Sequence, residues 1–101
     1  MDKEKAAAAF PKLFEDIREV IYQHDPSGLF AMGAPKDEHD DSIHRIISLL
    51  QHIHGPEGVQ EVLEDAMRDW IADKGDNPKE VCTAMAPAVW TAWSEFRGKV
   101  G

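Results

Sequence analysis

Residues 59–71, VQEVLEDAMRDWI, decide the fold, because their apolar side chains recur every three or four positions. That spacing places the apolar side chains on one face of a helix and leaves the carboxylates on the other faces. The apolar face consists of Val59, Val62, Leu63, Ala66, Met67, Trp70 and Ile71. Lys74 and Gly75 follow, a cation and a glycine where a helix C-terminus prefers them. The segment is predicted to be an amphipathic helix.

Three further segments show the same period, at about residues 3–23, from residue 40 to before Gly55, and from Pro78 to about Arg97. Their apolar positions are Phe10, Leu13, Phe14, Ile17, Val20 and Ile21, then Ile43, Ile46, Ile47, Leu50 and Ile53, then Val81, Met85, Val89, Ala92 and Phe96. Pro87 predicts a kink or a restart near Ala86 in the last segment. No segment alternates apolar and polar residues, so the prediction is an all-α, compact four-helix domain over residues 1–101.

Composition narrows the classes of function. The chain has 101 residues, enough for one core, with 11 Lys and Arg against 19 Asp and Glu and a net charge of -8. A nucleic-acid backbone is repelled by such a surface, so no nucleic-acid partner is expected. No apolar stretch has the length that a membrane span needs, and Cys82 has no second cysteine to pair with. These features favour a cytoplasmic protein, in which Cys82 is buried in the core.

One long connection, residues 24–41 (HDPSGLFAMGAPKDEHDD), joins the first and second helices. Asp25, Pro26 and Gly28 are turn residues, because Asp bonds backbone amides a short way on, Pro fixes its own torsion and Gly accepts a left-handed conformation. Pro35 makes a second bend. The apolar residues between the bends are expected to cover one end of the core, so the connection is predicted to be structured.

The connection carries a recognisable motif. Asp25-Pro26-x-Gly28-Leu29 is followed by Gly33 and Pro35, by Asp37-Glu38-x-Asp40, and by an isoleucine-rich helix with Ile43, Ile46 and Leu50. Over residues 13–72 this order resembles a family of short acidic bacterial proteins of unknown function. His39 stands where that family's motif has Tyr. The resemblance implies no catalytic role, and the occurrence of related proteins beside bacterial toxins implies an immunity or antitoxin-like role.

Carboxylates and histidines around the start of the second helix support two interpretations. Asp40, Asp41 and His44 have a helical spacing at which side chains can meet one Zn, Mn or Mg ion, which is the basis for a small metal-dependent hydrolase built on residues 37–44. Carboxylates at a helix N-terminus are, however, typical of capping and of the helix macrodipole. Since no paired metal-binding motif is present, capping is the preferred interpretation and no metal or other cofactor is expected.

The preferred hypothesis is a non-enzymatic protein interaction module that binds a basic partner through an acidic surface. The candidate surface residues are Asp37, Glu38, Asp40, Asp41, Glu61, Glu64 and Asp65. Besides the interaction module and the metal-dependent hydrolase, a third hypothesis is a structural homodimer that associates through the fourth helix. That helix offers Trp90 and Trp93, which are large enough either to form an interface or to fill the core.

Overall fold

The computed structural model describes residues 3–100, apart from the side chains of residues 3 and 5–7. These residues form four helices and no strand. The helices are α1 (Lys3–His24), α2 (Asp40–Leu50), α3 (Glu57–Lys74) and α4 (Pro78–Val100). The predicted all-α four-helix fold is confirmed.

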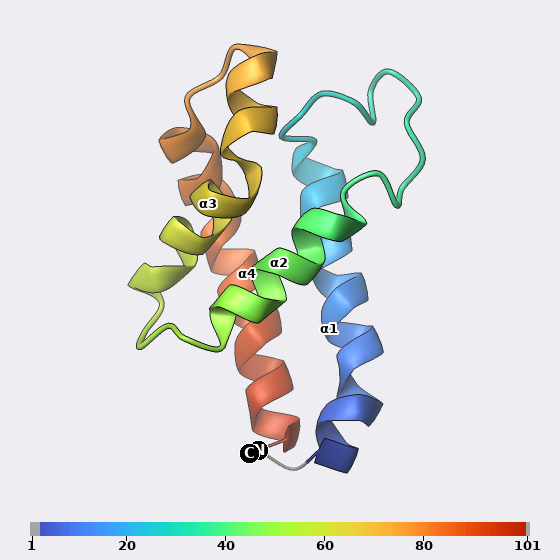
Figure 1. The fold of residues 1–101 in the computed structure, drawn as a ribbon, viewed down its shortest axis with the longest axis vertical. Helices are drawn as coiled ribbons and strands as arrows, with labels where there is room; N and C mark the ends of the chain where they lie inside the picture. The colour runs from blue at the N-terminus through green and yellow to red at the C-terminus, as the bar shows by residue number, and fades with distance from the viewer. Residues whose placement is uncertain (1–2, 101) are drawn as a thin grey trace.

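The two longest helices, α1 and α4, lie side by side, with the start of α1 and the end of α4 at the same end of the molecule (Figure 1). α3 packs on α4, and the short α2 lies against α3 and α1. Successive helices run in roughly opposite directions (Figure 1). The connection between α1 and α2 lies at the end opposite the start of α1 (Figure 1).

The core is built from the apolar faces that the sequence predicts, and every helix contributes to it. Its buried aliphatic residues include Leu13, Ile17, Ile21, Ile43, Ile46, Leu50, Val59, Leu63, Ile71 and Val89. Cys82 is buried among them, as expected, and burial raises the pKa of its thiol to about 11. At neutral pH the thiol therefore stays protonated and packs as a small apolar group.

Two helix boundaries differ from the prediction. α2 ends at Leu50 rather than just before Gly55, because the amides of His52 and Ile53 bond carbonyls only three residues back and tighten the chain into turns. α4 continues through Pro87 without a restart at Ala86. Pro87 lies on the exposed side of α4, so the hydrogen bond that it cannot donate is missing on the solvent side of the helix.

The connection between α1 and α2 is a series of hydrogen-bonded turns. Asp25 has a positive φ of 46°, and its carboxylate accepts hydrogen bonds from the amides of Phe30 and Ala31, each at 3.1 Å. These bonds reach five and six residues along the chain, further than the two residues of an ordinary Asp turn. Gly28, at φ 74°, lies against the side chain of Lys74 from α3, whose methylenes would be 3.3 Å from an added Cβ. The connection is thus fixed both internally and to α3.

Asp25→Ala is expected to lower the free energy of unfolding by about 2 kcal/mol, because two backbone amides lose their acceptor and Ala tolerates a positive φ poorly. Urea unfolding followed by circular dichroism measures the change. Asp25→Asn is the matched control, since Asn keeps one acceptor oxygen and tolerates the left-handed conformation. The free energy of unfolding of Asp25→Asn is expected to fall by less than half as much as that of Asp25→Ala. An equal loss in both variants would contradict this role of the carboxylate.

Candidate functional site

Negative charge is concentrated in one part of the chain. Residues 37–80, called here the acidic segment, hold twelve Asp and Glu against four Lys and Arg, a net charge of -8 that equals that of the whole chain. All seven residues of the predicted partner surface belong to this segment. In the folded protein the acidic segment comprises the end of the connection, α2, α3 and the start of α4.

Two of the seven predicted surface carboxylates hold helices together. Asp40 of α2 binds Arg18 of α1 through both oxygens, with its Oδ1 3.0 Å from Nε and its Oδ2 2.5 Å from Nη2. Asp65 of α3 binds Nε of Arg45 from α2 at 2.6 Å, and this hydrogen bond lowers the pKa of the Asp65 carboxyl below its ordinary value. The charges of Asp40 and Asp65 are therefore already compensated within the fold.

The other predicted surface residues remain available to a partner. Four of them are exposed and form no ion pair among the described residues: Asp37, Glu38, Asp41 and Glu61. Glu64 is half-buried and accepts a hydrogen bond only from Gln60, at 3.4 Å. The predicted partner surface left out further exposed carboxylates of the acidic segment that also lack an ion pair in residues 3–100: Glu57, Asp69, Asp73 and Glu80. A charge count by segment would have found them.

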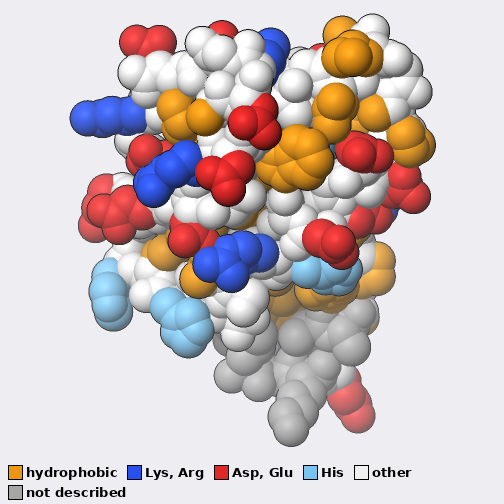
Figure 2. Space-filling view, turned by 45° about the horizontal axis from the view of Figure 1, so that its top comes forward, with side chains coloured by type: hydrophobic (Ala, Val, Ile, Leu, Met, Phe, Trp, Pro, Cys, Tyr) orange, Lys and Arg blue, Asp and Glu red, His pale blue; other side chains and the backbone are white. Residues whose placement is uncertain are grey.

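Figure 2 shows the face on which α2, α3 and the connection meet. Acidic side chains are spread over this face, with basic and hydrophobic side chains between them. The exposed hydrophobic side chains include Met32, 81% exposed in the connection, and Trp70, 38% exposed on α3. A partner surface here would thus be mixed, with carboxylates around apolar groups.

His39 fixes the end of the connection to α3. Its side chain is only 2% exposed, and its ring meets Phe30 and Trp70 edge-on, with ring centroids 5.5 and 4.8 Å apart. Nε2 lies 2.7 Å from Oγ of Ser27, whereas the buried Nδ1 has no hydrogen-bond partner among the described residues. Burial lowers the pKa of His39 below its ordinary value, although the charges of Glu38 and Asp25 act in the opposite direction. His39 is therefore a neutral, structural histidine, which the sequence alone did not predict.

The residues of the metal hypothesis are not brought together. Asp40 is bound by Arg18, and the exposed ring of His44 lies against Phe14, with centroids 4.8 Å apart. In residues 3–100 no group of three or more His, Cys, Asp or Glu side chains is close enough to hold one metal ion. Asp40 and Asp41 occupy the first turn of α2, where the helix macrodipole favours carboxylates.

The two tryptophans of α4 have different environments. Trp93 is 2% exposed and stacks on Phe96, with ring centroids 5.5 Å apart. Trp93 therefore fills the core of the single chain, and the homodimer through α4 stays a prediction. Trp90 is half-buried and packs against the edge of the core.

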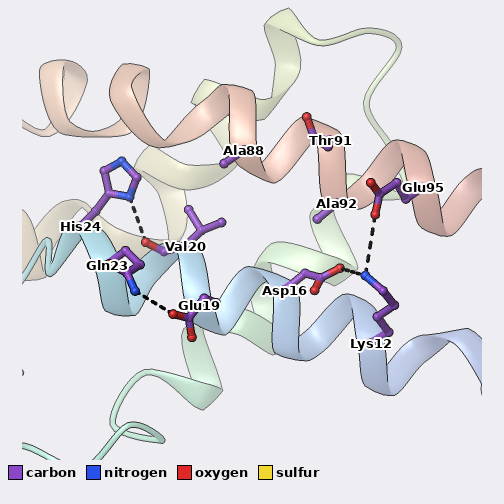
Figure 3. A pocket seen from close by; sticks show the side chains of 10 residues that line it. All are labelled: Lys12, Asp16, Glu19, Val20, Gln23, His24, Ala88, Thr91, Ala92 and Glu95. Atoms are coloured by element: carbon purple, nitrogen blue, oxygen red, sulfur yellow. Dashed lines mark hydrogen bonds and ion pairs between the residues drawn. The ribbon is translucent and has the colours of Figure 1, made fainter.

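A groove of about 400 Å³ lies between α1 and α4 (Figure 3). Its small apolar residues are Val20, Ala88 and Ala92, and its carboxylates come from both helices. Those carboxylates are ion-paired: Nζ of Lys12 lies 2.6 Å from Asp16 and 3.7 Å from Glu95, and Nζ of Lys36, from the connection, lies 2.7 Å from Glu19. The groove lining therefore has three carboxylates against one lysine, but each of the three carboxylates already has a cationic partner.

No family model, curated protein or solved structure matches this chain. The resemblance to short acidic bacterial proteins therefore stays a prediction, which rests on motif residues in the connection and in α2. Within residues 3–100, no helix has both the length and the apolar character that crossing a bilayer requires.

Proposed function

We propose that this protein is a non-enzymatic interaction module of the bacterial cytoplasm that binds a basic protein partner through the acidic segment. The observation that carries the proposal is the concentration of uncompensated charge: the carboxylates of Asp37, Glu38, Asp41 and Glu61 are exposed and have no ion pair within the described part of the chain. Three carboxylates of α1, by contrast, have cationic partners: Asp16 pairs with Lys12, Glu15 with Arg18, and Glu19 with Lys36 of the connection.

A basic surface is the chemistry that such a face recognises. Complementary charge accelerates encounter and excludes partners of the same sign, whereas exposed surface carboxylates contribute little to the stability of the fold itself. Proteins that act on nucleic acids have basic surfaces of this kind. An immunity or antitoxin-like role, in which the acidic segment covers such a surface, fits both the charge and the motif resemblance.

The test combines partner capture with kinetics. The immobilised protein captures partners from the lysate of the source cell, the captured protein is identified by mass spectrometry, and its association rate is measured at low and at moderate salt. Asp37→Asn, Glu38→Gln and Asp41→Asn together are expected to slow association about tenfold at low salt. The matched control is Glu15→Gln, Asp16→Asn and Glu95→Gln, which removes the same charge from α1 and α4 and is expected to change the rate less than twofold or so.

Two results would overturn the proposal. One is an association rate that does not depend on salt, because a contact made through exposed carboxylates is screened by ions. The other is an equal effect of both triple variants, since that would mean that the partner responds to overall charge and not to the acidic segment.

A further inference from the structure

A second groove, called here the α2–α3 groove, lies at the corner where the chain passes from α2 to α3, at the lower left of Figure 1. Its volume is about 430 Å³, within the range of about 300–1,000 Å³ that is common for ligand pockets. Leu49, Ile53 and Val62 supply its aliphatic side chains. Leu49 and Ile53 are half-buried, so part of each side chain faces the groove.

The backbone of α3 fixes the position of Ile53. A Cβ added to Gly58 would lie 2.9 Å from both Cβ and Cγ2 of Ile53, so the glycine lets this side chain pack directly against the helix. Val62, one turn further along α3, is 7% exposed and continues the apolar floor. The floor is thus held by α3 as well as by the 51–56 connection.

The rim of the α2–α3 groove is acidic. Glu57, Glu61 and Asp65 line one side of it at helical spacing, and no Lys or Arg is among its lining residues. Asp65 is compensated by Arg45, but Glu57 and Glu61 have no ion pair among residues 3–100. In the groove between α1 and α4 every lining carboxylate has an ion pair, so an aliphatic floor beside carboxylates without one, Glu57 and Glu61, distinguishes the α2–α3 groove among the described residues.

We propose that the α2–α3 groove is the anchor point for the partner, and that it accepts a basic amphipathic protein segment. An apolar side chain of that segment contacts Leu49, Ile53 and Val62, while Lys or Arg side chains next to it meet Glu57 and Glu61. This inference rests on the proposed function, since it locates the basic partner's apolar anchor on the acidic segment.

The aliphatic floor and the acidic rim of the α2–α3 groove together favour a segment that is both apolar and basic. A purely cationic segment would leave the aliphatic floor in contact with water, whereas an apolar segment without cations would bring no compensation to the carboxylates. Interfaces gain most of their affinity from a few anchors in pockets, with charged groups at the rim that set specificity and the rate of encounter. An acidic segment is rejected by like charge.

The probe is a synthetic helical peptide that has leucine at every third or fourth position and lysine elsewhere. Binding is followed by backbone amide chemical shifts and is expected to move the signals of Leu49, Ile53 and Val62 most. A second peptide with alanine in place of leucine keeps the charge and tests the apolar floor without a change to the protein, and its affinity is expected to fall about tenfold or more.

Paired charge variants test the rim. Glu57→Gln with Glu61→Gln removes two carboxylates from the groove, and Asp69→Asn with Asp73→Asn removes two from the same helix outside it. The first pair is expected to weaken peptide binding about tenfold and the second about twofold. If the two pairs weaken binding equally, or if the leucine and alanine peptides bind equally well, the groove inference is overturned while the proposed acidic segment stands. If neither pair has an effect, the groove inference is overturned, and the proposed function fails only if the triple variant of Asp37, Glu38 and Asp41 also has no effect.

Discussion

Trp93→Ala is expected to lower the free energy of unfolding by about 4 kcal/mol. The Trp93 side chain is 2% exposed and stacked on Phe96, so its removal leaves a large cavity in the part of α4 that faces the core. Trp90→Ala, three residues earlier, is expected to cost less than half as much, because that ring is half-buried. Urea unfolding of both variants at neutral pH measures the difference.

Light scattering of the same two variants separates a core role from an interface. If Trp93 joined two copies of the chain, its removal would lower the measured mass and the cost would depend on protein concentration. A core residue changes stability without changing mass. A larger loss of stability in Trp90→Ala than in Trp93→Ala would contradict the packing described above.

The helices were predictable because the apolar period of a helix is a local property of the sequence. In α3 the residues Val59, Val62, Leu63, Met67 and Ile71 are all buried, as the period predicts. The period does not, however, determine how much of the apolar face of a helix is buried by neighbouring segments. Trp70 belongs to the same apolar face but is 38% exposed, although the ring centroid of His39 from the connection lies 4.8 Å from that of its ring.

The place of Trp93 depends on tertiary structure in the same way. α4 packs against both α1 and α3, so a broad apolar arc on this helix is covered from two sides. From the sequence alone that width is more than one packed side requires, so an interface stood as the alternative to a role in the core. The number of neighbours that a helix has follows from topology and not from its own pattern.

The sequence predicted where the carboxylates of the candidate site lie, but not which of them form ion pairs. All seven predicted carboxylates lie in the acidic segment, whereas the compensation of Asp40 and Asp65 comes from Arg18 and Arg45, which are 22 and 20 residues earlier in the chain. Contacts over such separations depend on how the helices pack. The groove beside Glu57 and Glu61 escaped prediction for the same reason, since its floor comes from two helices and the turn between them.

His39→Ala is expected to lower the free energy of unfolding by about 3 kcal/mol, because the fully enclosed ring between Phe30 and Trp70 is replaced by a cavity and the hydrogen bond to Ser27 is lost. Ser27→Ala leaves the ring in place but removes its hydrogen-bond partner and the acceptor of the Leu29 amide, and is expected to cost about 1.5 kcal/mol. Urea unfolding measures both. Equal losses in the two variants would show that the ring itself contributes nothing to holding the connection on α3.

The same residue makes stability depend on pH. Burial lowers the pKa of His39 in the folded protein, whereas the unfolded chain has the ordinary value of about 6.5. Below that value the unfolded state binds more protons, so stability is expected to be full above about pH 6.5 and to fall as the pH drops below it. His39→Phe keeps an aromatic ring between Phe30 and Trp70 but does not titrate. Unfolding measured from pH 8 to pH 5 or so is expected to show a smaller loss in His39→Phe than in the wild type. All other titratable groups are common to both proteins, so an identical loss would show that the buried ring is not the source of the pH dependence.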